Sequence, residues 1–324
     1  QTGKVNVLRA GIWKPRTRPN AFEGVGKEAL TWLKQAGIDN NLPVATEVAN
    51  AQHVEACLKA GVDILWIGAR TTVNPFSVQE VADALKGVDI PILVKNPVNP
   101  DLQLWIGALE RIHQAGVTKL GAIHRGFSSF QKTAYRNVPK WEIPIELKAT
   151  FPEIDIICDP SHIAGTRSLL ATVAQKAMDL EMTGLMIESH VNPDEAWSDA
   201  KQQINPESLN ELIGNLTIRS TEASSFETSS ELTAFRKIID EIDESLIQTL
   251  VSRMALSEKI GQYKLDNNVT ILQIKRWEEI KKTRMEHAHC EGLNNEFVKN
   301  LLQLIHKESI RQQTDVMNKS VTVG

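Results

Sequence analysis

The stretch PILVKNP, residues 91–97, is an apolar run that ends in a lysine and an asparagine. An amphipathic stretch, LWIGALERIHQAG (104–116), follows it, and then comes a second apolar run, KLGAIHRG (119–126). Short apolar runs that alternate with amphipathic helices are typical of βα units whose strands form a parallel sheet. These residues therefore predict an α/β fold with a buried parallel sheet.

The same alternation extends in both directions, from residue 5 to about residue 216. Five further runs share this character: VNVLRAG (5–11), LPVATEV (42–48), DILWIGAR (63–70), DIICDPSH (155–162) and GLMIESHV (184–191). Seven strands are one short of the eight that close a (β/α)8 TIM barrel. We expect such a barrel over residues 1–216, with its first βα unit upstream of Gln1, and an open doubly wound sheet is the alternative.

The ends of the predicted strands favour the barrel. Polar residues stand at or just past the C-terminal end of every run: Arg9 with Lys14, Glu47, Arg70, Lys95, Arg125, His162 and Glu188. In a barrel these positions meet at one mouth, where barrel enzymes hold their active sites, whereas an open sheet would spread them along an edge.

The sequence pattern changes after Leu216. A linker rich in Ser, Thr and Glu is predicted over residues 217–228, and residues 229–319 contain only long helical patterns, at 229–265, 272–289 and 294–316. The first helix would be about 55 Å long at 1.5 Å per residue. Because so small an all-α domain cannot enclose that helix, we expect a partner chain to complete its core, as in a homodimer through this domain, with a higher homo-oligomer also open.

The bulk composition excludes some classes of partner. The net charge of −4 does not favour nucleic acid or an anionic membrane, and no apolar run approaches the roughly 18 residues of a membrane span. The three cysteines are few, odd in number and far apart, which indicates a reducing cytoplasm rather than a disulfide framework. Small molecules are the expected substrates.

The predicted mouth gathers five cations: Arg9, Lys14, Arg70, Lys95 and Arg125. Half-buried positive charges repel one another unless an anion lies among them, and a phosphate next to a carboxylate would suit guanidinium groups. Three further residues come late in the chain, His162, Glu188 and Asp199. A histidine with two carboxylates is a common ligand set for Mn²⁺, Fe²⁺ or Co²⁺.

Seven motifs in this order resemble the 3-deoxy-D-arabino-heptulosonate 7-phosphate (DAHP) synthase family, in its type I form without an N-terminal regulatory extension. They are IWKPRT (12–17), IGARTT (67–72), LVKNP (93–97), IHRGF (123–127), DPSH (159–162), MIESH (186–190) and SDAKQQ (198–203). The resemblance covers residues 1 to about 216. It implies condensation of phosphoenolpyruvate with erythrose 4-phosphate, the first step of the shikimate pathway.

The same resemblance assigns roles to residues. Arg9, Lys14, Arg70, Lys95 and Arg125 would hold phosphoenolpyruvate, and Lys14 is also the expected proton donor; Arg16 and Thr17 would hold erythrose 4-phosphate; His162, Glu188 and Asp199 would bind a divalent metal, with Mn²⁺ first and Fe²⁺ or Co²⁺ next. The fourth metal ligand of the family is a cysteine in a Gly-Pro-Cys motif on the first strand. We expect that motif upstream of Gln1.

Cations also interrupt an apolar stripe on the first predicted helix of the tail. The stripe begins at Leu232 and Phe235 and leads through Arg253 to Lys264, eleven residues later, so both cations lie on one face. Ser309 and Gln313, at i and i+4 on the third helix, offer neutral hydrogen-bonding groups. Two interpretations are open. The cations could lie at the ends of a helical bundle with their charged groups in water, or they could line a dry anion-binding pocket.

These positions resemble the all-helical (AroQ-type) chorismate mutase family. The resemblance implies an intertwined dimer, in which the chorismate or prephenate site uses Arg236 of the partner subunit with Arg253, Lys264, Arg276, Ser309 and Gln313. It casts Lys264 and Gln313 as the catalytic donors to the ether oxygen of chorismate. Two positions differ from the family: Gln273 stands where an Asp is common, and Trp277 stands where a Glu often contacts the substrate hydroxyl.

The sequence as a whole therefore predicts a fused enzyme, a transferase followed by an isomerase, with feedback inhibition of the barrel by prephenate or chorismate through the tail. One alternative is a synthase whose tail is a non-catalytic metabolite sensor and dimerisation module. A second is a barrel that binds phosphosugars without synthase chemistry. The related 3-deoxy-manno-octulosonate 8-phosphate synthases lack the Lys-Pro-Arg-Thr signature, so residues 14–17 argue against that family.

Overall fold

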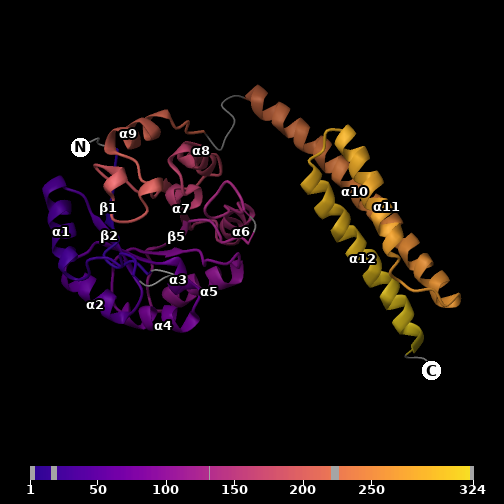
Figure 1. The fold of residues 1–324 in the computed structure, drawn as a ribbon, viewed down its shortest axis with the longest axis horizontal. Helices are drawn as coiled ribbons and strands as arrows, with labels where there is room; N and C mark the ends of the chain where they lie inside the picture. Colours follow the sequence, from indigo (N-terminus) through magenta and orange to yellow (C-terminus); the bar gives the residue numbers. More distant parts are fainter. Residues whose placement is uncertain (1–3, 16–19, 131, 220–225, 322–324) are drawn as a thin grey trace. The chain divides into compact units, whose positions relative to one another are not determined.

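The computed structural model describes residues 4–15, 20–130, 132–219 and 226–321 (Figure 1). The chain divides into two compact units, Gln1–Thr221 and Glu222–Gly324. Within the residues described, no helix is both long enough and apolar enough to cross a membrane.

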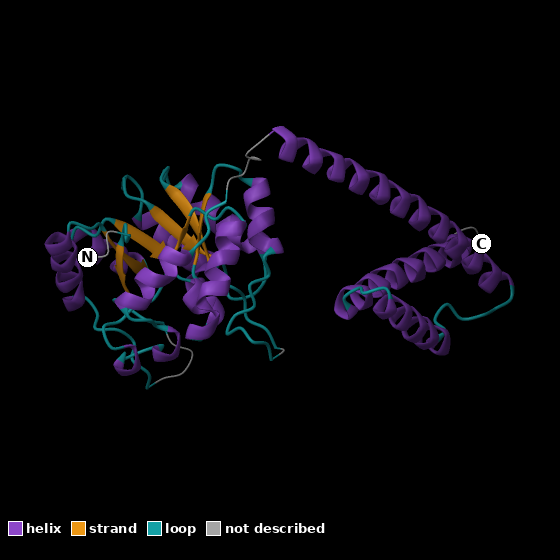
Figure 2. Ribbon diagram, turned by 90° about the horizontal axis from the view of Figure 1, so that it is seen from above, coloured by secondary structure: helices purple, strands orange, loops and turns teal. Residues whose placement is uncertain are grey.

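The first unit is built on one curled sheet of seven parallel strands in the order β1-β2-β3-β4-β5-β6-β7 (Figure 2). The strands are β1 (Leu8–Ala10), β2 (Val44–Val48), β3 (Ile64–Ile67), β4 (Ile92–Lys95), β5 (Leu120–His124), β6 (Asp155–Cys158) and β7 (Gly184–Leu185). Each strand pairs in parallel with the next one in the chain, as in a TIM barrel. A doubly wound sheet would reverse its strand order at a switch point, so the barrel prediction is confirmed.

Helices cover the outside of this sheet. They are α1 (Glu28–Asn40), α2 (Ala51–Lys59), α3 (Ala69–Thr72), α4 (Pro75–Ala84), α5 (Leu102–Gln114), α6 (Glu142–Thr150), α7 (Pro160–Ala164), α8 (Leu170–Asp179) and α9 (Pro206–Asn215), with short 3-10 turns at Arg167–Leu169, Pro193–Glu195 and Ala200–Gln202. Several begin at a side-chain cap that the sequence supplies. Asn50 Oδ1 accepts from the His53 amide at 2.9 Å, Asp101 Oδ1 from the Leu104 amide at 2.9 Å, and Asn205 Oδ1 from the Ser208 amide at 2.8 Å.

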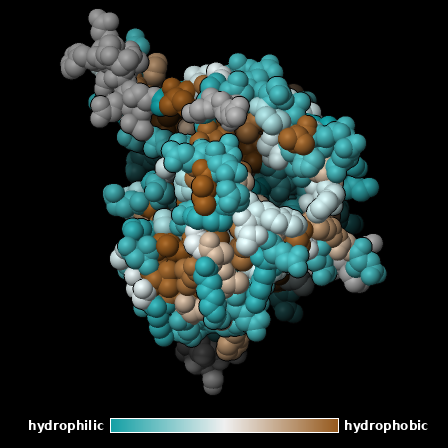
Figure 3. All heavy atoms as spheres, turned by 90° about the vertical axis from the view of Figure 1, so that its left-hand side faces the viewer, coloured by the Kyte–Doolittle hydropathy of each residue, from teal (hydrophilic) through white to brown (hydrophobic). Residues whose placement is uncertain are grey.

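The face of the molecule in Figure 3 is mainly hydrophilic, with hydrophobic side chains in separate patches. The apolar side chains of the first unit lie in two places. A large cluster packs between the strands and the outer helices, and it includes Leu65, Val94 and Trp105. A small cluster of Ala45, Trp66, Ile123 and Met186, with Val7, Leu93 and Ile157 packed against it, comes mainly from alternate strand positions.

The small cluster determines where the polar residues lie. Side chains two residues apart on a strand share a face. Arg9 therefore follows Val7, Glu47 follows Ala45, Lys95 follows Leu93 and Arg125 follows Ile123, each one step nearer the C-terminal end of its strand. The apolar residues thus form the floor of a site whose walls are charged.

The second unit is helical and consists of α10 (Phe226–Asp266), α11 (Ile274–Cys290) and α12 (Asn295–Val321). The three helices predicted for the tail are present, and α12 packs along both α10 and α11. Gly261 permits a close approach of α10 to α12, since a Cβ there would lie only 3.0 Å from Gln313 Cα.

Candidate active sites

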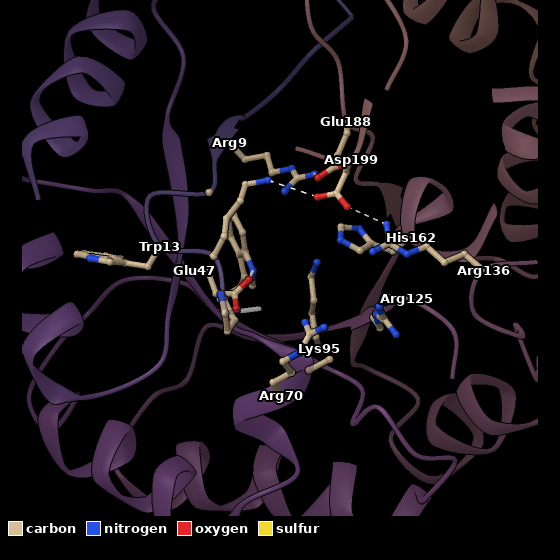
Figure 4. A pocket seen from close by; sticks show the side chains of 15 residues that line it. Arg9, Trp13, Glu47, Arg70, Lys95, Arg125, Arg136, His162, Glu188 and Asp199 are labelled. Carbon is tan, nitrogen blue, oxygen red and sulfur yellow. Dashed lines mark hydrogen bonds and ion pairs between the residues drawn. The ribbon is translucent and has the colours of Figure 1, made fainter. Parts of the chain in front are cut away.

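One pocket at the C-terminal ends of the strands brings together the residues that the sequence singled out. It is lined by all five predicted cations, Arg9, Lys14, Arg70, Lys95 and Arg125, and by His162, Glu188 and Asp199. Figure 4 shows the labelled side chains converging from separate strands and loops on one space, with Arg9, Glu188 and Asp199 on one side and Lys95, Arg70 and Arg125 on another. The predicted residues Arg16 and Thr17 lie outside the described residues.

Asp159 joins two walls of this pocket. The Lys95 ammonium is 2.8 Å from Asp159 Oδ2, and His162 Nδ1 is also 2.8 Å from that oxygen. Burial alone would raise the pKa of Asp159, but His162 and Lys95 hold it well below its usual range. Asp159 is therefore a fixed anion that orients both side chains.

The guanidinium group of Arg125 lies in a less favourable environment. Burial, together with the positive charges of Arg136 and Arg70, lowers the pKa of Arg125 to about 10, although Asp159 opposes the shift. The group still carries its charge at neutral pH, in a place that disfavours a cation. An anion between these guanidinium groups would relieve the repulsion.

The two carboxylates of the predicted metal set are each paired with cations. Glu188 Oε1 is 3.1 Å from Arg9, and Glu188 Oε2 accepts from Gln202 at 2.6 Å. Asp199 Oδ1 accepts from Arg136 at 2.9 Å, and Asp199 Oδ2 is 3.7 Å from the Lys14 ammonium. Within the described residues, no three His, Cys, Asp or Glu side chains lie close enough together to hold a metal ion.

The donor chemistry of the set nevertheless fits a divalent metal. His162 directs Nδ1 to Asp159, which leaves Nε2 as the ligand atom, and a carboxylate behind the ring is the usual partner of a metal-binding histidine. Glu188 is held by a hydrogen bond from Gln202 in addition to its ion pair with Arg9. Oxygen and imidazole donors suit Mn²⁺ or Fe²⁺.

The loop after β1 positions Lys14. Its backbone N–H donates to Glu23 O at 2.7 Å, and Gly24, at φ 99°, lies so close to Ile12 O that any Cβ there would be 2.1 Å from that oxygen. Trp13 stacks on His53 with 3.9 Å between ring centroids. The Lys14 ammonium reaches Ser198 Oγ at 2.7 Å, next to Asp199.

Three residues that line the pocket or contact its lining side chains were missed by the sequence reasoning. Arg136 belongs to a long loop between β5 and α6, far from any strand end, and no pattern marks it. Asp159 was visible within DPSH, directly after a strand, and its place next to His162 was the available signal. Gln202 was part of SDAKQQ and had no independent sign of a role.

A second polar group lies in the helical unit. Arg253 on α10 donates to Ser309 Oγ on α12, and the Lys264 ammonium donates to Gln313 Oε1 at 3.0 Å and to Ile271 O at 2.6 Å. Lys264, Ser309 and Gln313 are buried, and burial lowers the pKa of Lys264. Two cations thus face two neutral hydrogen-bonding groups across the α10–α12 interface.

Two residues predicted for this group are not part of it within one chain. Arg276 forms an ion pair with Glu279 on its own helix, and Arg236 is exposed on α10, 17 residues before Arg253.

The first unit has a clear family. Residues 3–222, about two thirds of the chain, match the model of the DAHP synthetase I family. The chain belongs to the DAHP synthetase I family. The DAHP synthetase unit is 30% identical over 209 residues to a phospho-2-dehydro-3-deoxyheptonate aldolase of Thermotoga maritima, a match that covers 64% of this chain and 60% of the relative. A crystal structure of the Thermotoga enzyme aligns with a TM-score of 0.58 at 30% identity, over 66% of this chain and 60% of that one.

The helical unit matches a different family. Residues 235–314 match the chorismate mutase type II model, so a chorismate mutase type II domain follows the DAHP synthetase unit. Over 92 residues this part is 30% identical to a bifunctional chorismate mutase/prephenate dehydratase of Buchnera aphidicola, a match that covers 28% of this chain and 24% of the relative. The chain thus spans less than two thirds of the length of these curated relatives.

Proposed function

We propose that the first unit condenses phosphoenolpyruvate with erythrose 4-phosphate to give DAHP and phosphate. The observation that carries this proposal is the single pocket shared by five cations and three potential metal ligands. Its cations suit a ligand with both a phosphate and a carboxylate. The reaction itself is proposed because the chain belongs to the DAHP synthetase I family.

The proposed role of each pocket residue follows from its position. Arg70, Lys95 and Arg125 lie on one side and would bind the phosphate and carboxylate of phosphoenolpyruvate, with Arg9 near Glu188. Their charges replace the water shell of the anion, so the departing phosphate leaves from a site already arranged for it. Lys14, next to Ser198 and Asp199, would donate a proton to the oxygen of the aldehyde as the new C–C bond forms. By resemblance, Arg16 and Thr17 would bind the phosphate of the aldose.

His162, Glu188 and Asp199 would hold the divalent metal, and we propose Mn²⁺ first. When bound, the ion supplies Lewis acid polarisation of the aldehyde carbonyl. Asp159 keeps the His162 ring in the tautomer that presents Nε2, while Arg9 and Arg136 hold the two carboxylates in place.

We also propose that the second unit converts chorismate to prephenate. Arg253, Ser309 and Arg276 of one chain, together with Arg236 of the partner subunit, would bind the carboxylates. Lys264 and Gln313 would donate to the ether oxygen. The rearrangement needs no nucleophile, because fixed donors placed where charge grows and a compact substrate conformer are sufficient. A non-catalytic sensor is the competing function of this unit.

The partner would be a second copy of the chain, and the support for it lies on α10. Phe235, Ile239, Ile242 and Leu246 are each more than half exposed along that helix. So many large apolar side chains on one long helix indicate a covered surface. We propose that the dimer covers them and brings Arg236 to the site of the other copy.

Two assays test the two activities separately. Phosphate release from phosphoenolpyruvate plus erythrose 4-phosphate tests the first, and its absence in metal-loaded protein would leave only a phosphosugar-binding barrel. Prephenate formation tests the second. Lys264→Ala should lower its rate roughly a hundredfold, as loss of one preorganised donor commonly does, while the exposed Lys259→Ala on the same helix serves as the control.

A further inference from the structure

A pair of stacked rings extends the polar group of the helical unit. Trp277 on α11 lies flat against His306 on α12, with ring centroids 3.9 Å apart and planes at 5°. His306 precedes Ser309 by three residues and Gln313 by seven, so all three share one face of α12. His306 therefore continues the row of side chains that contacts Arg253 and Lys264.

The other groups in this row already have partners. Ser309 Oγ accepts from Arg253 and donates to Ile305 O, while Gln313 accepts from Lys264 and donates to Ser309 O. By contrast, within the described parts of the chain the imidazole of half-buried His306 makes no hydrogen bond. Stacking restrains the plane of the ring and leaves its nitrogen atoms at the edge, where a ligand can reach them.

The charges around His306 define what it can recognise. Burial, together with the positive charges of Arg253 and Lys264, lowers the pKa of His306. The ring is therefore neutral at pH 7, with one donor and one acceptor. Such a ring suits a hydroxyl, whereas the neighbouring cations suit carboxylates.

Among the described residues of this row, the acceptors Ser309 Oγ and Gln313 Oε1 are already engaged by Arg253 and Lys264. Trp277, which the chorismate mutase resemblance places opposite the substrate hydroxyl, can donate through its indole N–H but has no acceptor. Gln273, at the start of α11, is exposed. His306 is the polar group that remains on the buried side of the row.

We propose that His306, held in plane by Trp277, hydrogen-bonds the ring hydroxyl of the cyclic dicarboxylate bound between Arg253 and Lys264, and so selects for that hydroxyl. The proposal rests on the proposed mutase site and names the residue that determines its specificity. His306 and Trp277 act together, because a ring free to rotate would lose the geometry of one weak hydrogen bond.

Three variants test this proposal. His306→Phe keeps an aromatic ring for the stack but removes both nitrogen atoms, His306→Gln restores a donor and an acceptor, and Gln273→Ala removes the competing group. Measurements are kcat/KM for chorismate and for the analogue without the ring hydroxyl, and the Kd of prephenate, which retains the hydroxyl, by titration calorimetry.

We expect His306→Phe to lower kcat/KM for chorismate about tenfold, the usual effect of one neutral hydrogen bond, and to leave the analogue unchanged. His306→Gln should recover most of that loss. Equal losses for both substrates would indicate a purely structural role and overturn the proposal, as would a tenfold loss in Gln273→Ala with none in His306→Phe.

The binding measurement separates this proposal from the mutase function. If the intact protein converts no chorismate, the mutase function fails, but a tenfold weaker Kd of prephenate in His306→Phe still supports the contact. A Kd that is the same in both proteins, or no binding of prephenate to the intact protein, overturns it.

Discussion

At the scale of single residues, the buried carboxylate of Asp159 restrains two neighbouring side chains in the pocket of the first unit. Asp159 is fully buried and pairs with Lys95 and His162, so one carboxylate restrains a predicted substrate ligand and a predicted metal ligand together. A change at His162 should therefore affect metal retention before it affects the fold.

His162→Ala removes the imidazole from the proposed metal set. We expect metal content to fall and phosphate release to be lost, while prephenate formation by the second unit continues. Metal analysis after gel filtration and the two activity assays measure this. His113→Ala, an exposed histidine near the end of α5, is the matched control. Unchanged turnover in chelator-treated protein would contradict the metal hypothesis.

We expect His124 to make the first unit sensitive to acid. Burial, together with the positive charge of Arg125, lowers the pKa of His124 to about 3, whereas an unfolded histidine has a pKa near 6.5. Between these values the unfolded chain binds more protons than the folded one. The free energy of unfolding therefore falls as the pH falls through this window, by at most about 1.4 kcal/mol per pH unit.

His124→Phe removes this proton from the balance. Urea unfolding followed by tryptophan fluorescence, at pH 7 and pH 5, should show that the variant loses less stability than the wild type on acidification. The difference should approach about 2 kcal/mol over that interval. Parallel losses in the two proteins would mean that other groups control the acid response.

At the scale of elements, α10 combines two roles. Arg253 and Lys264 face α12, and the exposed apolar side chains come earlier on the same helix. At 41 residues α10 extends about 60 Å, and a lone helix of mixed charge gains little stability from propensity alone. Packing against a second copy would bury the exposed stripe.

Replacing Ile239 and Ile242 with Glu tests this role of α10. The two carboxylates would have to be buried in the proposed interface, so the dimer should dissociate and prephenate formation should decline with it. Light scattering after gel filtration measures the mass. Lys237→Glu, an exposed change on the same helix, should leave the dimer intact. A monomeric wild type, or a double variant of unchanged mass, would rule out this interface.

At the scale of the whole molecule, one chain carries a DAHP synthetase unit and a chorismate mutase unit. The first would make an early product of the pathway, and the second would act on a late one. A tether keeps two units at high local concentration without requiring a fixed contact. We propose that ligand bound in the mutase pocket restricts the mouth of the barrel, which requires the ligand to favour the restricted state.

The rate of DAHP formation against prephenate concentration tests this regulation. The intact chain should be inhibited, whereas Arg253→Ala and a chain that ends at Leu216 should lose the inhibition. Metal content and rate without prephenate, measured for each protein, control for damage to the barrel. An equal response in all three proteins would mean that the tail is not the sensor.

Much of the fold was determined by local sequence patterns. The seven apolar runs became the seven strands because a strand buried on both faces requires apolar residues throughout, and the three amphipathic stretches of the tail became α10, α11 and α12. The pocket residues at strand ends were also predictable, because a parallel sheet that curls brings those ends together whatever the detailed packing.

Other features were decided only by the tertiary structure. Arg136 reaches Asp199 from a loop with no periodic pattern, and His306 meets Trp277 through the packing of two helices. Neither contact has a signature along the chain, because both depend on where distant backbone segments come to lie. Periodicity within a segment reports which face is buried, whereas partners between segments are selected by the fold.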